Sequence, residues 1–260
     1  MAFFSIYAGA GQFRPPRKVV FRSREVLDQV RTEGLEGVFS SSRHIRKMCN
    51  ASFDVTGVQY AGQGEFKMCH RITMEKEGQQ ISLALLTAKQ QVSMGNEFEF
   101  YRRYKGVRYF PRVYELSPFR EPLLAHGKVV FGCDFIVREF IDAPLAINYR
   151  SDKVAMMRYL RAVRALMMAG IKVEDEMDVA NLNNAFFLQE SGTFRFIDHR
   201  TGGDFYEVSV SRLIRGLSSG SLVERRRMLR MFLGLPEFQR WCGSTVEQVE
   251  QYWTDIDSIP

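Results

Sequence analysis

Alternating apolar and polar residues predict three antiparallel strands over residues 53–89. Glycines interrupt this alternation at two places. The first interruption, AGQGEF, has Gly62 and Gly64 on either side of Gln63, and the second is EKEGQQ. Because glycine adopts turn conformations without steric cost, each interruption is expected to be a tight turn. The third strand, ISLALLTAK, ends in Lys89.

Helical spacing follows these strands in NEFEFYRRYKG. Asn96 is expected to cap this helix, which places Glu97 and Glu99 in the first turn, where carboxylates complement the helix dipole. Two β-rich segments come next, VRYFPRVYELSP and KVVFGCDFIVREFID. The pattern therefore predicts five strands with one helix inserted after the third. Ahead of them, Ser23 and the spacing of REVLDQVRTEGL predict a short helix that ends at Gly34.

The later apolar patterns are helical. RSDKVAMMRYLRAVRALMMAG predicts an amphipathic helix that stops at Gly170. SRLIRGL and LVERRRMLRMFLG predict basic amphipathic helices, and Val246, Val249 and Trp253 fit the buried face of a last one. Residues 1–20 contain Gly and Pro at short intervals and are expected to form an irregular arm. The chain is therefore expected to be α+β, with strands first and helices after them.

One polar loop stands out between these helices. Residues 169–200 read AGIKVEDEMDVANLNNAFFLQESGTFRFIDHR, in which AFFL and FRFI predict a short hairpin with QESGT as its turn. An acidic and Asn-rich loop precedes the hairpin, and Asp198 follows it. An Asp in such a loop can orient or deprotonate a hydroxyl, and Asn and Asp oxygens suit Mg²⁺. Asp178 and Asn183 are candidates for these roles, and the competing interpretation is that they are turn formers.

Composition narrows the class of protein. With 260 residues, of which 45% are hydrophobic and 25% charged, the chain can bury a core in one large domain or two lobes. The net charge of +6 comes mostly from grouped arginines. Such groups suit an anionic partner, such as a nucleotide or a phospholipid headgroup, or form a solvated basic face. No nucleic-acid-binding module is recognisable, so no nucleic-acid partner is expected.

Cysteine spacing and hydropathy bear on location. The cysteines, Cys49, Cys69, Cys133 and Cys242, lie far apart and lack metal-ligand spacing, which indicates reduced thiols. No apolar run reaches the roughly 18 residues of a membrane span. The charged residues near the start follow the apolar ones, the reverse of a secretory signal. A cytoplasmic protein without a cleaved leader is therefore expected.

The order of these features resembles that of the protein-kinase-like superfamily over residues 55–235. A glycine turn, Lys89, a helix with Glu97, a hinge at REFIDAPL and the acidic loop follow one another as in that fold. The sequence is most similar to the lipopolysaccharide core sugar kinases of the Kdo/heptose kinase group. NEFEFYRRYKGVRYFPRVYEL resembles that group's helix and following strand, FRFIDHR is similar to its Ile-Asp-Leu-His-Arg pattern, and VSVSRLIRGLSSGSLVERRRMLRMFLGL resembles its short tail.

The resemblance implies a bilobal protein-kinase-like fold of the α+β class. Residues 1–50 would be an N-terminal extension with a short helix. Residues 51–143 would form a small lobe built on an antiparallel sheet, and residues 144–260 a mainly helical large lobe that carries the catalytic loop. ATP and Mg²⁺ are the implied cofactors.

The site residues that the resemblance implies have three roles. Gly62, Gly64, Lys89, Glu97 and Glu139 would bind the nucleotide, Asp178 would be the catalytic base, and Asn183 and Asp198 would hold Mg²⁺. The loop that begins at Gly170 is longer than in the family. Asp175 therefore competes with Asp178 for the role of base, and Asn184 competes with Asn183 as a metal ligand.

The resemblance implies a phosphotransferase that phosphorylates a hydroxyl, with a lipopolysaccharide core sugar as one candidate acceptor. An anionic or lipid-linked sugar would suit the basic surface and a location in the cytoplasm or peripherally at the inner membrane. Glu176 replaces a family His, and Ala180 replaces the Lys found two residues after the Asp in protein kinases. These departures favour one alternative, a catalytically inactive kinase-like protein that binds or regulates a partner. A secreted effector protein kinase, with a protein as the acceptor, is a further alternative.

Overall fold

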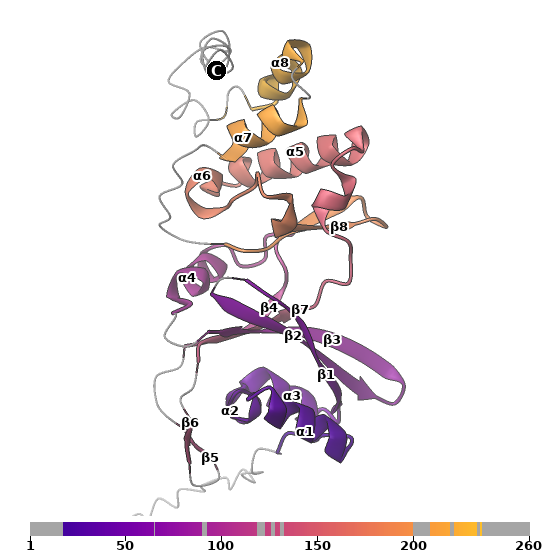
Figure 1. Ribbon diagram of the computed structural model, residues 1–260, viewed down its shortest axis with the longest axis vertical. Coiled ribbons are helices and arrows are strands. Elements are labelled where there is room, and N and C mark those ends of the chain that lie inside the picture. Colours follow the sequence, from indigo (N-terminus) through magenta and orange to yellow (C-terminus); the bar gives the residue numbers. More distant parts are fainter. Residues whose placement is uncertain are drawn as a thin grey trace, which may run out of the picture. The chain divides into compact units, whose positions relative to one another are not determined.

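The computed structural model describes residues 18–64, 66–89, 93–118, 123–125, 128–130, 133–199, 209–218, 221–232 and 235. These residues form a mixed α+β structure with an antiparallel sheet, which confirms the expected class (Figure 1). They divide into two compact units. The first unit contains residues 18–89 together with 114–137, and the second contains 93–113 together with residues from 138 onward.

A five-stranded sheet organises the first unit. Its strands are β1 (Asp54–Gln63), β2 (Lys67–Lys76), β3 (Gln79–Ala88), β4 (Val113–Ser117) and β7 (Phe135–Glu139), in the order β1-β2-β3-β7-β4. β1, β2 and β3 pair antiparallel, which confirms the prediction from alternation. A separate hairpin joins β5 (Leu123–Ala125) to β6 (Lys128–Val130).

Two of the predicted strands differ from the sequence pattern. VRYFPRVYELSP contributes only β4, and Pro111, which has no N–H for a ladder hydrogen bond, lies just before it. KVVFGCDFIVREFID is divided between β6 and β7 and does not form a single strand. The five-stranded sheet with one helix after its third strand is nevertheless present.

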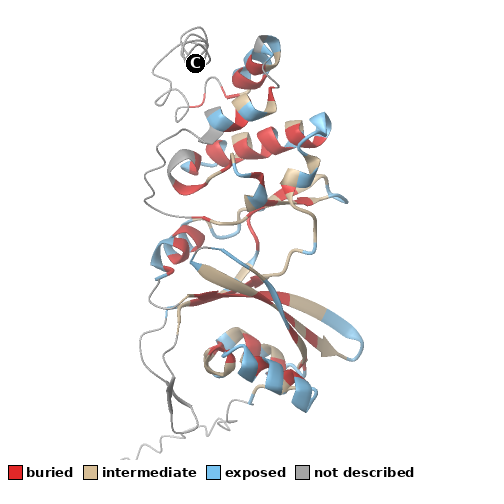
Figure 2. Ribbon diagram, in the orientation of Figure 1, coloured by how far each residue is buried: buried red, intermediate tan, exposed pale blue. Residues whose placement is uncertain are grey.

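Three helices pack on this sheet, α1 (Arg24–Thr32), α2 (Glu36–Ser41) and α3 (Arg43–Asn50). Val30, Phe39 and Ile45 from these helices share one buried core with Ile72 and Leu85 of the sheet. Figure 2 shows buried positions on both the helices and the strands. The sequence pattern predicted α1 and did not predict α2 or α3.

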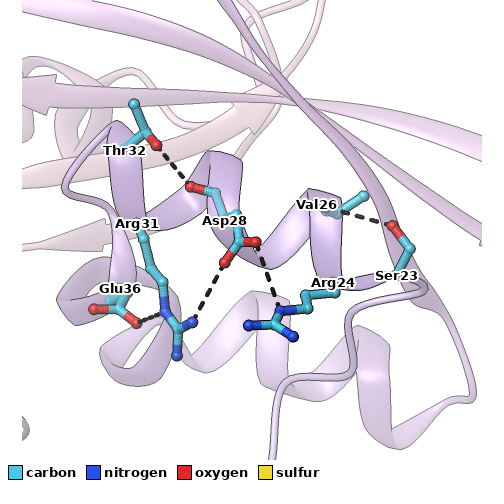
Figure 3. A network of polar contacts seen from close by, with 7 residues as sticks. All are labelled: Ser23, Arg24, Val26, Asp28, Arg31, Thr32 and Glu36. Carbon is cyan, nitrogen blue, oxygen red and sulfur yellow. Dashed lines mark hydrogen bonds and ion pairs between the residues drawn. The ribbon is translucent and has the colours of Figure 1, made fainter.

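Helix α1 begins and ends as its sequence predicts. The Ser23 hydroxyl accepts a hydrogen bond from the Val26 N–H at 3.4 Å, and Gly34 follows the helix with φ +68°. On the exposed side, Arg31 donates to Glu36 at 2.9 Å and to Asp28 at 3.4 Å (Figure 3). Exposed ion pairs of this kind contribute about 0–1 kcal/mol each, so the buried face of α1 matters more for its position.

Glu115 of β4 binds the N-terminus of α3. One carboxylate oxygen accepts from the Ser42 hydroxyl at 2.6 Å and from the His44 N–H at 2.8 Å, and the other accepts from the Arg43 N–H at 3.0 Å. The first N–H groups of a helix lack partners within the helix and carry partial positive charge. The carboxylate satisfies them and fixes α3 to the sheet.

The second unit contains mostly helices. Its elements are α4 (Gly95–Arg103), a 3₁₀ helix η1 (Ala146–Tyr149), α5 (Lys153–Met168), α6 (Val173–Glu176), a 3₁₀ helix η2 (Leu182–Asn184), β8 (Ala185–Leu188), β9 (Thr193–Phe196), α7 (Ser209–Leu217) and α8 (Leu222–Arg230). α5 is the predicted core helix, capped by Asp152 and followed by Gly170 at φ +79°. The predicted hairpin and the two basic helices are also confirmed.

The predicted cap of α4 is wrong. The helix begins at Gly95, two residues before the start that a cap at Asn96 implies, and Asn96 lies inside its first turn. The Ser93 hydroxyl, and not the Asn96 side chain, accepts a hydrogen bond at the start of this helix, from the Gly95 N–H at 3.1 Å.

Among the described residues, no helix is long and apolar enough to cross a membrane. Cys242, the predicted last helix and the irregular arm before residue 18 lie outside the described residues.

Candidate active site

The β8–β9 hairpin positions Asp198. Its two strands pair antiparallel from Ala185 opposite Phe196 to Leu188 opposite Thr193. The pairing extends beyond β9, because the Ile197 N–H donates to the Asn184 carbonyl oxygen at 2.8 Å. Asn184 is therefore held beside the residue that precedes Asp198.

Asp198 has an unusual backbone conformation. Its φ is +64°, in the left-handed region that non-glycine residues seldom adopt and that Asp tolerates better than most. The other described non-glycine residues with positive φ, Ser52 and Glu77, lie in turns. Asp198 instead precedes a β-bridge, and backbone strain of this kind is concentrated at functional sites.

Asp178 lies on the segment that faces Asp198. Met177 and His199 form an antiparallel bridge, so Asp178 and Asp198 are the next residues on two facing segments. The side chain of Asp178 is 25% exposed, and its Oδ1 accepts a hydrogen bond from Nη2 of Arg212 in α7. The Tyr159 hydroxyl of α5 donates to the carbonyl oxygen of the following residue, Val179, at 2.9 Å. Complete burial, with a contribution from Asp178, raises the pKa of Tyr159, so this hydroxyl stays protonated as a donor.

The two adjacent asparagines have different surroundings. The Asn184 side-chain amide is half-buried and donates to the Asp178 carbonyl oxygen at 3.5 Å. Asn183 is exposed, and its N–H donates to the Asn181 side chain at 3.2 Å. The structure therefore brings Asn184 together with Asp178 and with the segment before Asp198, whereas the described contact of Asn183 is local.

Asp175 lies in the short helix α6, whose end at Glu176 comes just before the bridge at Met177. The backbone therefore places Asp178 at the facing position, with Asp175 three residues earlier in the chain. The side chain of Asp175 lies outside the described residues.

Helix α4 contacts the segments on both sides of the acidic pair. Glu176, 3% exposed, accepts from the Arg103 guanidinium at 2.8 Å. The buried His199 ring stacks on Phe100 with ring centroids 4.3 Å apart and meets the edge of Tyr101 at 5.3 Å. α4 thus holds the segments just before Asp178 and just after Asp198, and the Glu176 carboxylate is paired with the Arg103 guanidinium.

Two more predicted site residues belong to this unit. Glu97 of α4 is 7% exposed, whereas Glu99 is 59% exposed and pairs with Arg103 at 2.7 Å. Glu139, at the end of β7, accepts from the Arg112 N–H at 3.0 Å and so holds the residue that directly precedes β4. No described contact tests a nucleotide-binding role for Glu97 or Glu139.

The first unit brings Lys89 together with the glycine turn. Gly62 has φ +141° at an irregularity in the β1–β2 pairing, and the Gly64 N–H closes the turn on the Lys67 carbonyl oxygen at 2.9 Å. Directly beyond, the Lys89 N–H donates to the Phe66 carbonyl oxygen at 2.9 Å. A half-buried lysine and two glycines without side chains therefore lie at one end of the sheet.

Asp178, Asn184 and Asp198 carry carboxylate and amide oxygens, which are the type of ligand that Mg²⁺ prefers. Within the described ranges, no three His, Cys, Asp or Glu side chains are grouped as a metal site. Mg²⁺ is commonly bound by one or two carboxylates together with phosphate oxygens and water. Oxygen donors of this type would suit a metal ion whose other ligands are phosphate oxygens and water.

Arg212 and Arg103 were not predicted from the sequence. Arg212 is 34 residues from Asp178, and Arg103 is 73 residues from Glu176. No local pattern connects such positions. The only signal was the basic character of SRLIRGL, the predicted helix that contains Arg212.

Neither protein-family models nor curated proteins gave a match to this sequence.

Proposed function

We propose that this chain is an ATP- and Mg²⁺-dependent phosphotransferase with a bilobal protein-kinase-like fold, acting on a hydroxyl. One observation carries the proposal. Asp178, Asn184 and the strained Asp198 lie on segments joined by the Met177–His199 bridge, the Ile197–Asn184 hydrogen bond and the Asn184–Asp178 contact. A carboxylate that can act as base toward the acceptor hydroxyl, and oxygen ligands for a metal, are the groups that phosphoryl transfer needs.

Each residue has a definite part in the proposed reaction. Asp178 orients the acceptor hydroxyl and takes its proton. Asn184 and Asp198 would hold Mg²⁺, which when bound neutralises charge on the phosphate oxygens. The helical position of Asp175 and the exposed position of Asn183 favour the other member of each competing pair.

The first unit supports phosphate binding independently. A lysine ammonium is a point charge suited to phosphate oxygens, and glycines allow a ligand to approach the backbone. The hydrogen bond between Lys89 and Phe66 places these features at one end of the same sheet. In the proposal, Lys89 therefore binds nucleotide phosphate beside the turn with Gly62 and Gly64.

The acceptor that we propose is a sugar hydroxyl on an anionic, lipid-linked saccharide such as a lipopolysaccharide core. The net charge of +6 favours such a partner electrostatically. In α8, Arg227 and Arg230 are exposed together with Val223, a combination that suits a peripheral contact with an anionic membrane surface. Comparison of saccharide acceptors with and without phosphate groups would test the charge preference.

Nucleotide binding is tested by thermal unfolding of the full chain with millimolar ATP, with and without Mg²⁺. A ligand at ten times its Kd contributes about 1.4 kcal/mol, which corresponds to a rise in Tm of roughly 3–5 °C for a chain of this size. We expect this rise for the native chain with ATP and Mg²⁺ together. In Asp198→Asn the Mg²⁺-dependent part is expected to disappear, because one metal ligand loses its charge.

Asp152→Asn is the matched control, since it removes a carboxylate from the same unit at the cap of α5, away from Asp198 in sequence. It should keep the full Mg²⁺-dependent rise. A native chain whose Tm does not respond to ATP and Mg²⁺, or an Asp198→Asn chain that responds as the native one does, would contradict the proposal.

A further inference from the structure

Arg212 is a cation placed at the carboxylate of the proposed base. It belongs to the first turn of α7, and its Nη2 donates to Asp178 Oδ1. The arginine side chain is 44% exposed, so the charged end remains in contact with solvent beside Asp178. The contact joins positions that are 34 residues apart in the chain.

The backbone of α7 is well anchored at this point. Leu213 and Ile214, which follow Arg212 directly, are both buried. An arginine between buried neighbours and solvent keeps its stem in place while its guanidinium reaches outward. The position of Arg212 is therefore set by packing, and its pairing with Asp178 follows from that position.

The loop after Asp178 supplies no cation of its own. Residues 179–184 read VANLNN, with neither Lys nor Arg. Asp178 and Asp198 would both repel a phosphoryl group that approaches them, so positive charge is needed at this point. Among the residues that the structure describes, Arg212 is the cation that forms an ion pair with Asp178.

We infer that Arg212 binds the phosphoryl group that is transferred, supplying from α7 the positive charge that the loop lacks. This inference rests on the proposed function. A guanidinium is planar and has five N–H donors, so it can hold the Asp178 carboxylate and a phosphoryl oxygen at the same time. The same contact keeps the base next to the group that its acceptor attacks, since both are bonded to one rigid fork.

The test compares ATP with ADP, because only ATP carries the terminal phosphoryl group. Isothermal titration calorimetry measures the Kd of each nucleotide with Mg²⁺ for the native chain, Arg212→Gln and Arg212→Lys. We expect Arg212→Gln to weaken ATP binding about tenfold or more, the loss typical of a hydrogen bond to a charged group, and to leave ADP binding unchanged. Arg212→Lys keeps the charge without the fork and should fall between the two.

Arg161→Gln is the control, since it removes an exposed arginine from α5 of the same unit. It should leave both Kd values and the Tm as in the native chain. If the ratio of the ATP Kd to the ADP Kd were the same in the native and Arg212→Gln chains, the inference would be overturned and the proposed function would remain intact. Tighter ATP binding in Arg212→Gln would show that the arginine blocks the site and would overturn it too. A native chain that binds neither nucleotide would overturn the proposed function and the inference together.

Discussion

Asn183 and Asn184 are neighbours in the chain, and the difference in their hydrogen bonds gives them different predicted roles. The side-chain amide of Asn184 donates to the Asp178 backbone carbonyl oxygen, and the Asn184 backbone carbonyl oxygen accepts from the Ile197 N–H. Asn183 is exposed, and its described contact is with Asn181. The spacing from Asp178 favoured Asn183, whereas its place directly before AFFL made Asn184 the competing candidate.

Asn184→Ala is therefore expected to lower phosphoryl transfer about 10- to 100-fold, the usual effect of disturbing a metal site or its supporting shell. Asn183→Ala is expected to retain native activity, because it removes an exposed amide. Steady-state rates of both variants at saturating ATP and Mg²⁺ measure the difference. A larger loss in Asn183→Ala than in Asn184→Ala would show that the hydrogen-bonded asparagine is not the functional one.

Among the elements, those with local patterns could be predicted from the sequence. β1, β2 and β3 follow from alternation, α5 from its apolar spacing and Gly170, and the β8–β9 hairpin from AFFL and FRFI. The helices α2 and α3 could not be predicted, because their polar and basic residues hide the few buried positions, such as Phe39 and Ile45. The start of α4 was misplaced because a serine two residues before the helix binds its first N–H.

Contacts between distant elements explain the other failures of prediction. The N-terminus of α3 depends on Glu115, more than 70 residues away, and the site depends on Arg212 and Arg103 in the same way. Such pairs carry no local sequence signal, because either partner alone resembles an ordinary surface charge. They become visible only when the elements are packed together.

Glu115→Ala tests the docking of α3 on β4. It removes a carboxylate that accepts from Ser42, Arg43 and His44, and it leaves the first N–H groups of the helix without that partner. The free energy of unfolding is expected to fall by about 2 kcal/mol, the scale of hydrogen bonds to a charged group.

Urea denaturation monitored by circular dichroism measures this change. Asp28→Ala is the control, because Asp28 makes exposed ion pairs on α1 and should change the free energy of unfolding by no more than about 0.5 kcal/mol. If both variants lost the same stability, the carboxylate of Glu115 would not be what holds α3 to the sheet.

At the scale of the whole molecule, each unit carries one part of the predicted chemistry. The first has Lys89 beside a glycine turn, and the second has Asp178, Asn184 and Asp198 on joined segments. The order of these features along the chain was readable from the sequence. Their local surroundings, on which we base the proposal of Asp178 over Asp175 and Asn184 over Asn183, could be described only from the structure.

The central claim is that Asp178 serves phosphoryl transfer. The most direct measurement follows the labelled γ-phosphate of ATP in the full chain with Mg²⁺ and a lipopolysaccharide acceptor, counting label on the acceptor, on the protein and as free phosphate. The native chain is predicted to transfer label only when Mg²⁺ is present. Asp178→Asn should lower the rate by about 10²–10⁴, the contribution of general base catalysis, and Asp175→Asn should leave it near the native rate. A native chain that binds ATP with Mg²⁺ but moves no more label than Asp178→Asn would contradict this account.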